Sequence, residues 1–280
     1  MENLYHYTTT TGIKGIIEEK KIYATNIFYL NDASEFEYAH NLLFQEIDKR
    51  RKDRKGKGKN PSPIITSDFL EKMKDYLAPI ILRKYGIYVC SFSAKKDLLS
   101  QWRGYCFDGS GFCVGFKHSD IKKLQEELSE KFQCSLVKCI YTPSQQKKEI
   151  SSFVDNFLDK ISTYPFTSND PKILDKLFYK FIEIAPIFKD SSFQQEEEWR
   201  LVLGARGLRT DDVQFRPGST LLIPYIKVPF ELNGNPIFDE IMIGPSPNQE
   251  LSRESLRQHL YKQNIKGCRI NISKIPYRGL

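Results

Sequence analysis

The chain has 280 residues, which is enough for one large domain or two small ones, and its 40% hydrophobic and 28% charged content is typical of a globular protein. Its net charge of +7 comes from residues 49–60, which hold eight basic residues and one acidic residue, while the rest of the chain is balanced. The basic excess therefore belongs to one segment and does not indicate a nucleic-acid-binding domain.

The six cysteines include no CxxC pair, and no secretory signal precedes them. We therefore expect them to be reduced and mostly buried. The chain starts Met1-Glu2-Asn3, without the apolar segment of a signal peptide, and no apolar run approaches the roughly 18 residues of a membrane span. The sequence predicts a soluble, cytoplasmic protein with no membrane partner.

The predicted elements are short strands separated by helices. Residues 3–8 alternate as in a strand, and the hydroxyl groups of 9–11 can cap a helix that places Ile13, Ile16 and Ile17 on one face. Further strands are predicted at 21–30, 86–93, 112–116, 135–141, 198–203, 220–228, 238–243 and 267–272. Helices are predicted at about 34–49, 66–84, 119–131, 144–162, 171–188 and 248–262, with 94–105 helical or irregular and 204–219 loop-like.

This order lacks a regular strand–helix–strand repeat and predicts an α+β fold. No interdomain linker is visible, so residues 1–280 are predicted to form a single domain with helical insertions at about 34–85 and 143–190. The basic run 49–60 contains glycines, and we expect it to be a mobile loop.

The sequence lacks the common catalytic motifs. It has no GxxxxGK[ST], HExxH, GxSxG or GxGxxG pattern, and its four histidines are too scattered to indicate a metal site. We therefore predict no bound metal. No cysteine stands out as a nucleophile. Three segments with chemically useful side chains remain.

Each of the three segments also has a purely structural interpretation. The first, His6-Tyr7-Thr8, offers a histidine that is neutral at pH 7, although a lone strand histidine is more often structural. The second, 86–93 with 100–105, combines hydroxyls and aromatic rings that suit a flat polar ligand, or forms an ordinary core strand. The third, 195–200, is either a solvated acidic turn or a strand with Glu196, Glu198 and Arg200 on one face.

The sequence resembles the DUF2971 family of uncharacterised, mostly bacterial proteins. The matching motifs follow the expected order to about residue 244: Leu4-Tyr5-His6-Tyr7-Thr8, Ala24-Thr25-Asn26, Leu30-Asn31-Asp32 with Glu35, Ser91-Phe92-Ser93, Trp102 and Tyr105, 111–116, Glu196 with Glu198-Trp199-Arg200, and 241–244.

A more distant resemblance is to ADP-ribosyltransferases of the poly(ADP-ribose) polymerase and diphtheria-toxin type, whose signature is His-Tyr-Glu. Here His6-Tyr7-Thr8 with 15–17 is similar to their first motif, 86–89 with Ser100 and Tyr105 to the second, and Glu198 to their late glutamate. The resemblance implies a mixed, mainly antiparallel split β-sheet core. The chain departs from it in the long middle helices and in Tyr7, where that family has Gly.

The resemblance implies NAD⁺ as the substrate. His6 would bind an adenosine ribose hydroxyl and the backbone of Tyr7 and Thr8 the nicotinamide amide, while Glu198 would stabilise the positive charge that develops on the other ribose. The remaining groups implied are Tyr88 or Tyr105 stacking on the ring, Ser93 or Ser100 near its carboxamide, Glu196 as a general base, and Arg200 on pyrophosphate or paired with Glu198.

The sequence does not identify the acceptor of ADP-ribose, which is protein, nucleic acid or water. The biological role implied is that of a bacterial toxin or a phage-defence effector. Two alternatives belong to other classes. One is a non-enzymatic module of defence or stress response, in which His6 and Glu198 are structural. The other is a metal-dependent nucleic-acid-processing enzyme that uses Glu196 and Glu198.

Overall fold

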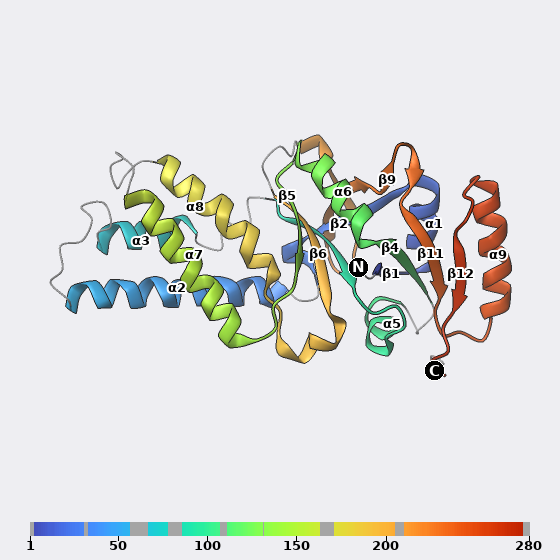
Figure 1. Ribbon diagram of the computed structural model, residues 1–280, viewed down its shortest axis with the longest axis horizontal. Helices are drawn as coiled ribbons and strands as arrows, with labels where there is room; N and C mark the ends of the chain where they lie inside the picture. The colour runs from blue at the N-terminus through green and yellow to red at the C-terminus, as the bar shows by residue number, and fades with distance from the viewer. Residues whose placement is uncertain are drawn as a thin grey trace. The chain divides into compact units, whose positions relative to one another are not determined.

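The computed structural model describes residues 3–30, 33–56, 67–77, 86–106, 111–130, 132–162, 171–204 and 210–276. These residues form two compact units. The first contains residues 1–25, 88–138 and 194–280, and the second contains 26–87 and 139–193 (Figure 1). The second unit thus collects the two segments predicted as helical insertions. That all 280 residues form one domain stays a prediction.

The first unit is built on a mostly antiparallel sheet. Ten of the described strands belong to it, in the order β12-β11-β4-β1-β3-β2-β8-β7, with β6 pairing β3 and β5 pairing β6. The strands on the path are β12 (Arg269–Ile272), β11 (Phe238–Ile243), β4 (Phe112–Lys117), β1 (Asn3–Thr8), β3 (Tyr88–Ser93), β2 (Lys21–Asn26), β8 (Leu222–Pro229) and β7 (Val213–Pro217). The branch contains β6 (Glu198–Leu203) and β5 (Cys134–Lys138). Only β11 and β12 are parallel among the registered pairs, so the predicted α+β fold with a mainly antiparallel sheet is confirmed.

Short helices connect and cover these strands. Thr9 caps α1 (Thr10–Glu19) by accepting a hydrogen bond from the Gly12 amide at 3.2 Å. This confirms the predicted use of a hydroxyl cap. The others are α5 (Leu99–Tyr105), α6 (His118–Ser129) and α9 (Gln249–Lys262). A small hairpin of β9 (Glu231–Leu232) and β10 (Asn235–Pro236) connects β8 to β11. Contacts link α1 to β1 and β4, α6 to β4 and β5, and α9 to β11 and β12 (Figure 1).

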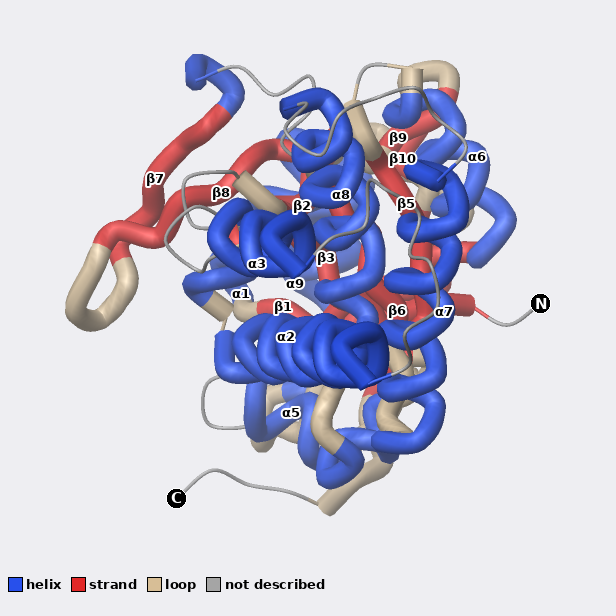
Figure 2. Tube along the Cα trace, turned by 90° about the vertical axis from the view of Figure 1, so that its left-hand side faces the viewer, coloured by secondary structure: helices blue, strands red, loops and turns tan. Residues whose placement is uncertain are grey.

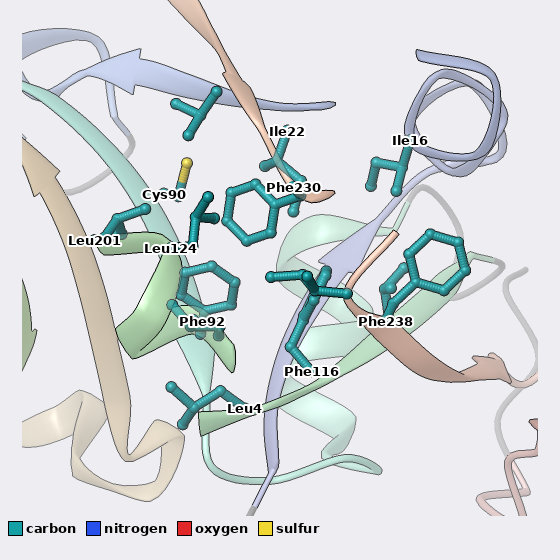
Figure 3. Close-up of a cluster of buried hydrophobic side chains, with 14 of the residues drawn as sticks. Leu4, Ile16, Ile22, Cys90, Phe92, Phe116, Leu124, Leu201, Phe230 and Phe238 are labelled. Atoms are coloured by element: carbon teal, nitrogen blue, oxygen red, sulfur yellow. The ribbon is translucent and has the colours of Figure 1, made fainter. Parts of the chain in front are cut away.

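The main core of this unit lies between the sheet and these helices. Figure 3 shows Phe92, Phe116 and Phe230 packed among aliphatic side chains from β1, α1, β2 and α6. Their ring centroids are 5.2–5.9 Å apart, within the range of favourable aromatic pairs. Burying each such ring stabilises the fold by about 1.5–3 kcal/mol. Phe92 therefore holds the middle of β3 in place beside the candidate site.

The second unit is helical. It contains α2 (Ala33–Gly56), α3 (Ser67–Tyr76), α7 (Pro143–Ser162) and α8 (Pro171–Ile184), with the short 3-10 turns η1 (Ile27–Tyr29) before α2 and η3 (Ala185–Ile187) after α8. Helix α2 contacts α3 and α7, and α3 contacts α8 (Figure 2). The side chain of Arg50 joins α2 to α7, because its guanidinium donates to Asp155 at 2.5 and 2.9 Å and to Ser151 at 2.9 Å.

Some elements differ from their predicted bounds. Helix α2 continues to Gly56, through most of the run predicted as a mobile loop, because its Lys and Arg residues are good helix formers. Residues 57–60 and 78–85 lie outside the described part of the chain. Strand β7 lies within 204–219, which was predicted as loop. Its side chains are mostly exposed, so backbone pairing with β8 forms the strand without an apolar pattern in the sequence.

Candidate functional site

A small pocket lies where three strands of the first unit meet. Strand β1 pairs with β4 over six residues, but its register with β3 is the single pair Tyr5–Ser93. Ser93 also pairs with Glu198, the first residue of β6. Beyond the Tyr5–Ser93 pair, β1 and β3 separate, and the pocket opens there. It is lined by Tyr5, His6, Tyr7, Ser91, Phe92, Ser93, Gln101, Tyr105, Glu196 and Glu198.

The His6 ring bridges the gap between the two separating strands. Its Nδ1 atom lies 3.0 Å from the backbone oxygen of Ser91, and the ring is tilted against Phe92 with the centroids 6.0 Å apart. Burial lowers the pKa of His6 below its ordinary value, so the ring is neutral at pH 7. A neutral ring that donates from Nδ1 to a carbonyl carries no proton on Nε2, which makes Nε2 a hydrogen-bond acceptor.

Glu198 is held by a buried ion pair. The Arg200 guanidinium donates from Nε to Oε1 at 2.8 Å and from Nη2 to Oε2 at 3.2 Å. Glu198 is 3% exposed and Arg200 is 2% exposed. Residues two apart on a strand point to the same face, which brings the two side chains together. The two-point contact fixes the orientation of the carboxylate at the pocket wall.

The chain turns sharply just before β6. Glu196 ends the 3-10 helix η4 (Ser191–Glu196), and Glu197 has a φ of 43°, in the left-handed region that non-glycine residues seldom adopt. The Glu197 carbonyl accepts a hydrogen bond from the Ala94 amide, and its carboxylate pairs with Lys95 at 2.8 Å. This turn lets Glu196 and Glu198 line the same pocket although Glu196 precedes the strand.

Ser93 connects the carboxylate side of the pocket to the segment that follows β3. Its hydroxyl donates to the backbone oxygen of Glu196 at 2.6 Å and accepts from the Lys95 amide at 3.0 Å. The side chain is 2% exposed. These two hydrogen bonds account for its hydroxyl, so Ser93 positions the turn before Glu198.

The opposite wall comes from α5, which is anchored to β1. The Tyr7 hydroxyl donates to the Lys95 oxygen at 2.8 Å and accepts from the Leu98 amide at 3.1 Å. The Tyr7 ring packs edge-on against Trp102 with the centroids 4.7 Å apart. Asp97 accepts from Trp102 Nε1 at 2.8 Å and from Ser273 Oγ at 2.7 Å. These contacts fix the start of the helix that brings Gln101 and Tyr105 to the pocket.

The pocket is narrow and negatively charged. Its volume is about 40 Å³, which is room for roughly three water molecules and is well below the ~300–1,000 Å³ of a typical small-molecule site. Among the described residues, the lining includes two carboxylates and neither lysine nor arginine. The pocket therefore favours a small neutral or cationic group.

The structure brings together part of the predicted site. The predicted residues that line the pocket are His6, Tyr7, Ser93, Tyr105, Glu196 and Glu198. Arg200 lies behind Glu198, as the predicted pairing requires. Tyr7 lines the pocket, but its hydroxyl is already used within the protein.

Three predicted residues lie outside the lining. Tyr88 is at the far end of β3 from Ser93, opposite Leu203, and is packed in the hydrophobic core. The predicted stacking of Tyr88 on a bound ring is therefore not supported by its position. Thr8 ends β1 beside Phe112, past the pocket. The Ser100 hydroxyl is sealed from solvent and has no hydrogen-bond partner among the described residues, so it does not take the predicted place near a carboxamide.

Four lining residues were not predicted as site residues: Tyr5, Ser91, Phe92 and Gln101. Tyr5 is joined to a buried carboxylate, because its hydroxyl donates to Glu240 at 2.8 Å, and Gly115 leaves the space that Glu240 occupies. Tyr5 belongs to the first family motif and Gln101 precedes the motif residue Trp102, which is the one signal that pointed to them. Neither residue belongs to a motif with a known chemical role.

Other expectations concern the chain as a whole. All six cysteines are free, and four of them are buried. No group of three or more histidine, cysteine, aspartate or glutamate side chains suited to a metal ion occurs among the described residues. In the same part of the chain, no helix is both long enough and apolar enough to cross a membrane.

Comparison with known proteins finds that part of the chain is similar to a family without assigned chemistry. Residues 101–201 match the model of DUF2971, described as a protein of unknown function, which confirms the family predicted from the sequence. The matched range starts at Gln101 and ends after Arg200, so it includes one wall of the pocket and both carboxylates. No curated protein and no solved structure matched the chain.

Proposed function

We propose that this protein binds NAD⁺ and cleaves the bond between nicotinamide and ribose, passing ADP-ribose to water or to a macromolecule. One observation supports this proposal above the others. His6 and Glu198, which are far apart in the sequence, line one pocket at the point where the sheet separates. The order of these residues and the sheet on which they meet correspond to the resemblance to ADP-ribosyltransferases.

The electrostatics of the pocket suit this substrate. The nicotinamide ring of NAD⁺ is a cation that becomes neutral when its glycosidic bond breaks, and positive charge then develops on the ribose. The two carboxylates of the lining favour a cationic ring, and the fixed Glu198 carboxylate stabilises the charge on the ribose. His6 Nε2, as an acceptor, suits a ribose hydroxyl. The bulk of the dinucleotide lies outside the 40 Å³ of the inner pocket.

Hydrolysis by this route balances simply. The bond between the ribose C1′ and the ring nitrogen breaks, and its electron pair goes to nicotinamide. Water forms the new bond to C1′ and loses a proton, for which Glu196 is the candidate base. A protein or nucleic-acid nucleophile in place of water gives ADP-ribosylation. The cytoplasmic location and a role as a toxin or defence effector belong to the same proposal.

Incubation of the purified 280-residue chain with NAD⁺ tests the proposal. Free nicotinamide is measured by chromatography, and transfer is measured with adenine-labelled NAD⁺ in the presence of added protein or nucleic acid. Removing a group that stabilises the developing charge lowers such rates by about 10²–10³. We expect Glu198→Gln to cause a loss of this size. Glu46→Gln is the matched control, since Glu46 also pairs with an arginine, at 2.7 Å, but lies in the second unit.

Absence of both nicotinamide release and labelling from the wild-type chain would contradict the proposal. That result would favour the alternative of a non-enzymatic module of defence or stress response. No specific observation favours the metal-dependent alternative. In that alternative Glu198 would bind the metal, but both of its carboxylate oxygens are bonded to Arg200. Nuclease activity that depends on Mg²⁺ or Mn²⁺ and is lost in Glu198→Gln would overturn that preference.

A further inference from the structure

Gln101 is the one buried polar side chain of the pocket wall whose hydrogen-bonding groups are not used by the described protein. Its side chain is 6% exposed and it lines the pocket. Its backbone amide donates to the Leu98 oxygen at 3.1 Å. The side-chain amide has no hydrogen bond to any residue that the structure describes.

The Gln101 amide is not among the described polar atoms that are sealed from solvent without a partner, so it faces the open pocket, where water or a ligand can satisfy it. Gln146, in the second unit, shows the usual arrangement. It is 1% exposed, and its amide nitrogen donates to the Ile140 oxygen at 2.6 Å and to the Lys189 oxygen at 2.9 Å. Gln101 is almost equally buried but lacks such bonds. Its amide is therefore available to a bound molecule.

The chemistry of a glutamine side chain restricts that molecule. The amide presents one acceptor oxygen and two N–H donors side by side. A second primary carboxamide matches this pattern with two reciprocal hydrogen bonds. A carboxylate can only accept, and it would also meet the charges of Glu196 and Glu198. The space of roughly three water molecules suits a group of three heavy atoms such as a carboxamide.

The mouth of the pocket suits the rest of an aromatic amide. Tyr105, the last residue of α5, lines the pocket and is 39% exposed. An aromatic ring attached to a carboxamide held by Gln101 can lie against this half-exposed ring, which is one turn further along the same helix. Both contacts then come from one rigid element.

We propose that Gln101 is the specificity-determining residue of the pocket and selects a ligand that carries a primary carboxamide on an aromatic ring. This inference rests on the proposed function, in which that group is the nicotinamide of NAD⁺. It assigns recognition of the amide to the Gln101 side chain. Ser100, which the sequence predicted for this position, has its hydroxyl sealed from solvent.

The test uses Gln101→Met in the full chain, with Gln146→Met as the matched control. Binding of nicotinamide and of nicotinic acid is measured by calorimetry, and unfolding midpoints are measured without ligand. We expect the wild-type chain to prefer the amide by at least about 10-fold, and Gln101→Met to lose roughly that factor. Gln101→Met should leave the unfolding midpoint unchanged or raise it, whereas Gln146→Met should lower it.

The possible outcomes separate this inference from the proposed function. If the wild-type chain cleaves NAD⁺ but Gln101→Met keeps the same preference for the amide, the role of Gln101 is wrong and the proposed function stands. If nicotinamide binds and depends on Gln101 but NAD⁺ is not cleaved, the inference stands and the proposed activity is wrong. If neither nicotinamide nor NAD⁺ binds the wild-type chain, or if Gln101→Met unfolds as readily as Gln146→Met, the inference is overturned.

Discussion

The imidazole of His6 takes the place of a strand partner for Ser91: its Nδ1 atom lies 3.0 Å from the Ser91 backbone oxygen, where β1 and β3 have already separated. A partly buried carbonyl at the edge of a separating ladder would otherwise lack a protein hydrogen bond. The histidine thus satisfies the backbone of β3 and leaves Nε2 as an acceptor. Its structural and functional interpretations are compatible.

His6 makes stability depend on pH. Burial lowers its pKa in the folded protein, so the unfolded chain binds more protons as the pH falls below about 6.5. The contribution of neutral His6 is complete above that value and is lost progressively below it. When the pH falls from 7.5 to 5.5, the free energy of unfolding should decrease in both proteins. We expect the decrease to be smaller in His6→Gln than in the wild type, by about 1 kcal/mol. Urea unfolding at the two pH values measures the difference.

His40 and His118 also have lowered pKa values, so the variant will keep part of the pH dependence. An equal slope in the wild type and His6→Gln would show that the ring is accessible to protons in the folded state.

Variants of the Glu198–Arg200 pair can distinguish a role of Glu198 in folding from a role in chemistry. Removing one partner of a buried ion pair typically costs about 3–5 kcal/mol, because the other charge is left uncompensated. We expect Arg200→Met to be destabilised by this amount and the double variant Glu198→Met with Arg200→Met to recover most of it. Chemical denaturation measures the recovery. The double variant should nevertheless bind or turn over NAD⁺ as poorly as Glu198→Gln. Recovery of both properties would show that the carboxylate has no role beyond folding.

The Ser93 hydroxyl should contribute more to the free energy of unfolding than the hydroxyl of Ser91 on the same strand. Ser93→Ala removes a donor to the buried Glu196 oxygen and an acceptor for the partly buried Lys95 amide. We expect a loss of about 1–3 kcal/mol in the free energy of unfolding. Ser91→Ala leaves the backbone oxygen that His6 contacts and should cost less than about 0.5 kcal/mol. Thermal unfolding of the two variants compares them, and equal losses would contradict the assignment.

Arg50 should stabilise the helical unit through its geometry as well as its charge. Its planar guanidinium contacts Glu46, Ser151 and Asp155, an arrangement that a lysine cannot reproduce. The side chain is partly exposed, so we expect Arg50→Lys to cost only about 1 kcal/mol. Arg253→Lys, in a single exposed helix pair, should cost almost nothing. Denaturant midpoints of the two variants test this, and similar midpoints would show that α2 and α7 are held by apolar packing alone.

Much of the secondary structure follows from local patterns. Residues 3–8, 198–203 and 238–243 have the bounds predicted for them, because period-two alternation and β-branched or aromatic side chains act over a few residues. The apolar pattern of the sequence was less informative where pairing with another strand determines the structure. Strand β7 has few buried side chains and exists through its pairing with β8, so no apolar signal marks it.

The candidate site shows the same division. Glu198 and Arg200 face one side of a strand, as their spacing predicts, and therefore pair. The sequence could not show that Tyr88 belongs to the core whereas Ser93 belongs to the pocket, because both lie on one predicted strand. The single contact at which β1 leaves β3 decides this, and it depends on the whole sheet.

The sequence by itself determined the α+β class, most element positions and the chemical types near residues 6, 93 and 196–200, because these depend on short-range periodicity and turn chemistry. The tertiary structure alone decided that His6 and Glu198 line one pocket, that Ser100 is sealed, and that the Gln101 amide has no described protein partner. Whether a buried polar group is satisfied depends on atoms brought from distant parts of the chain, and local sequence does not encode that directly.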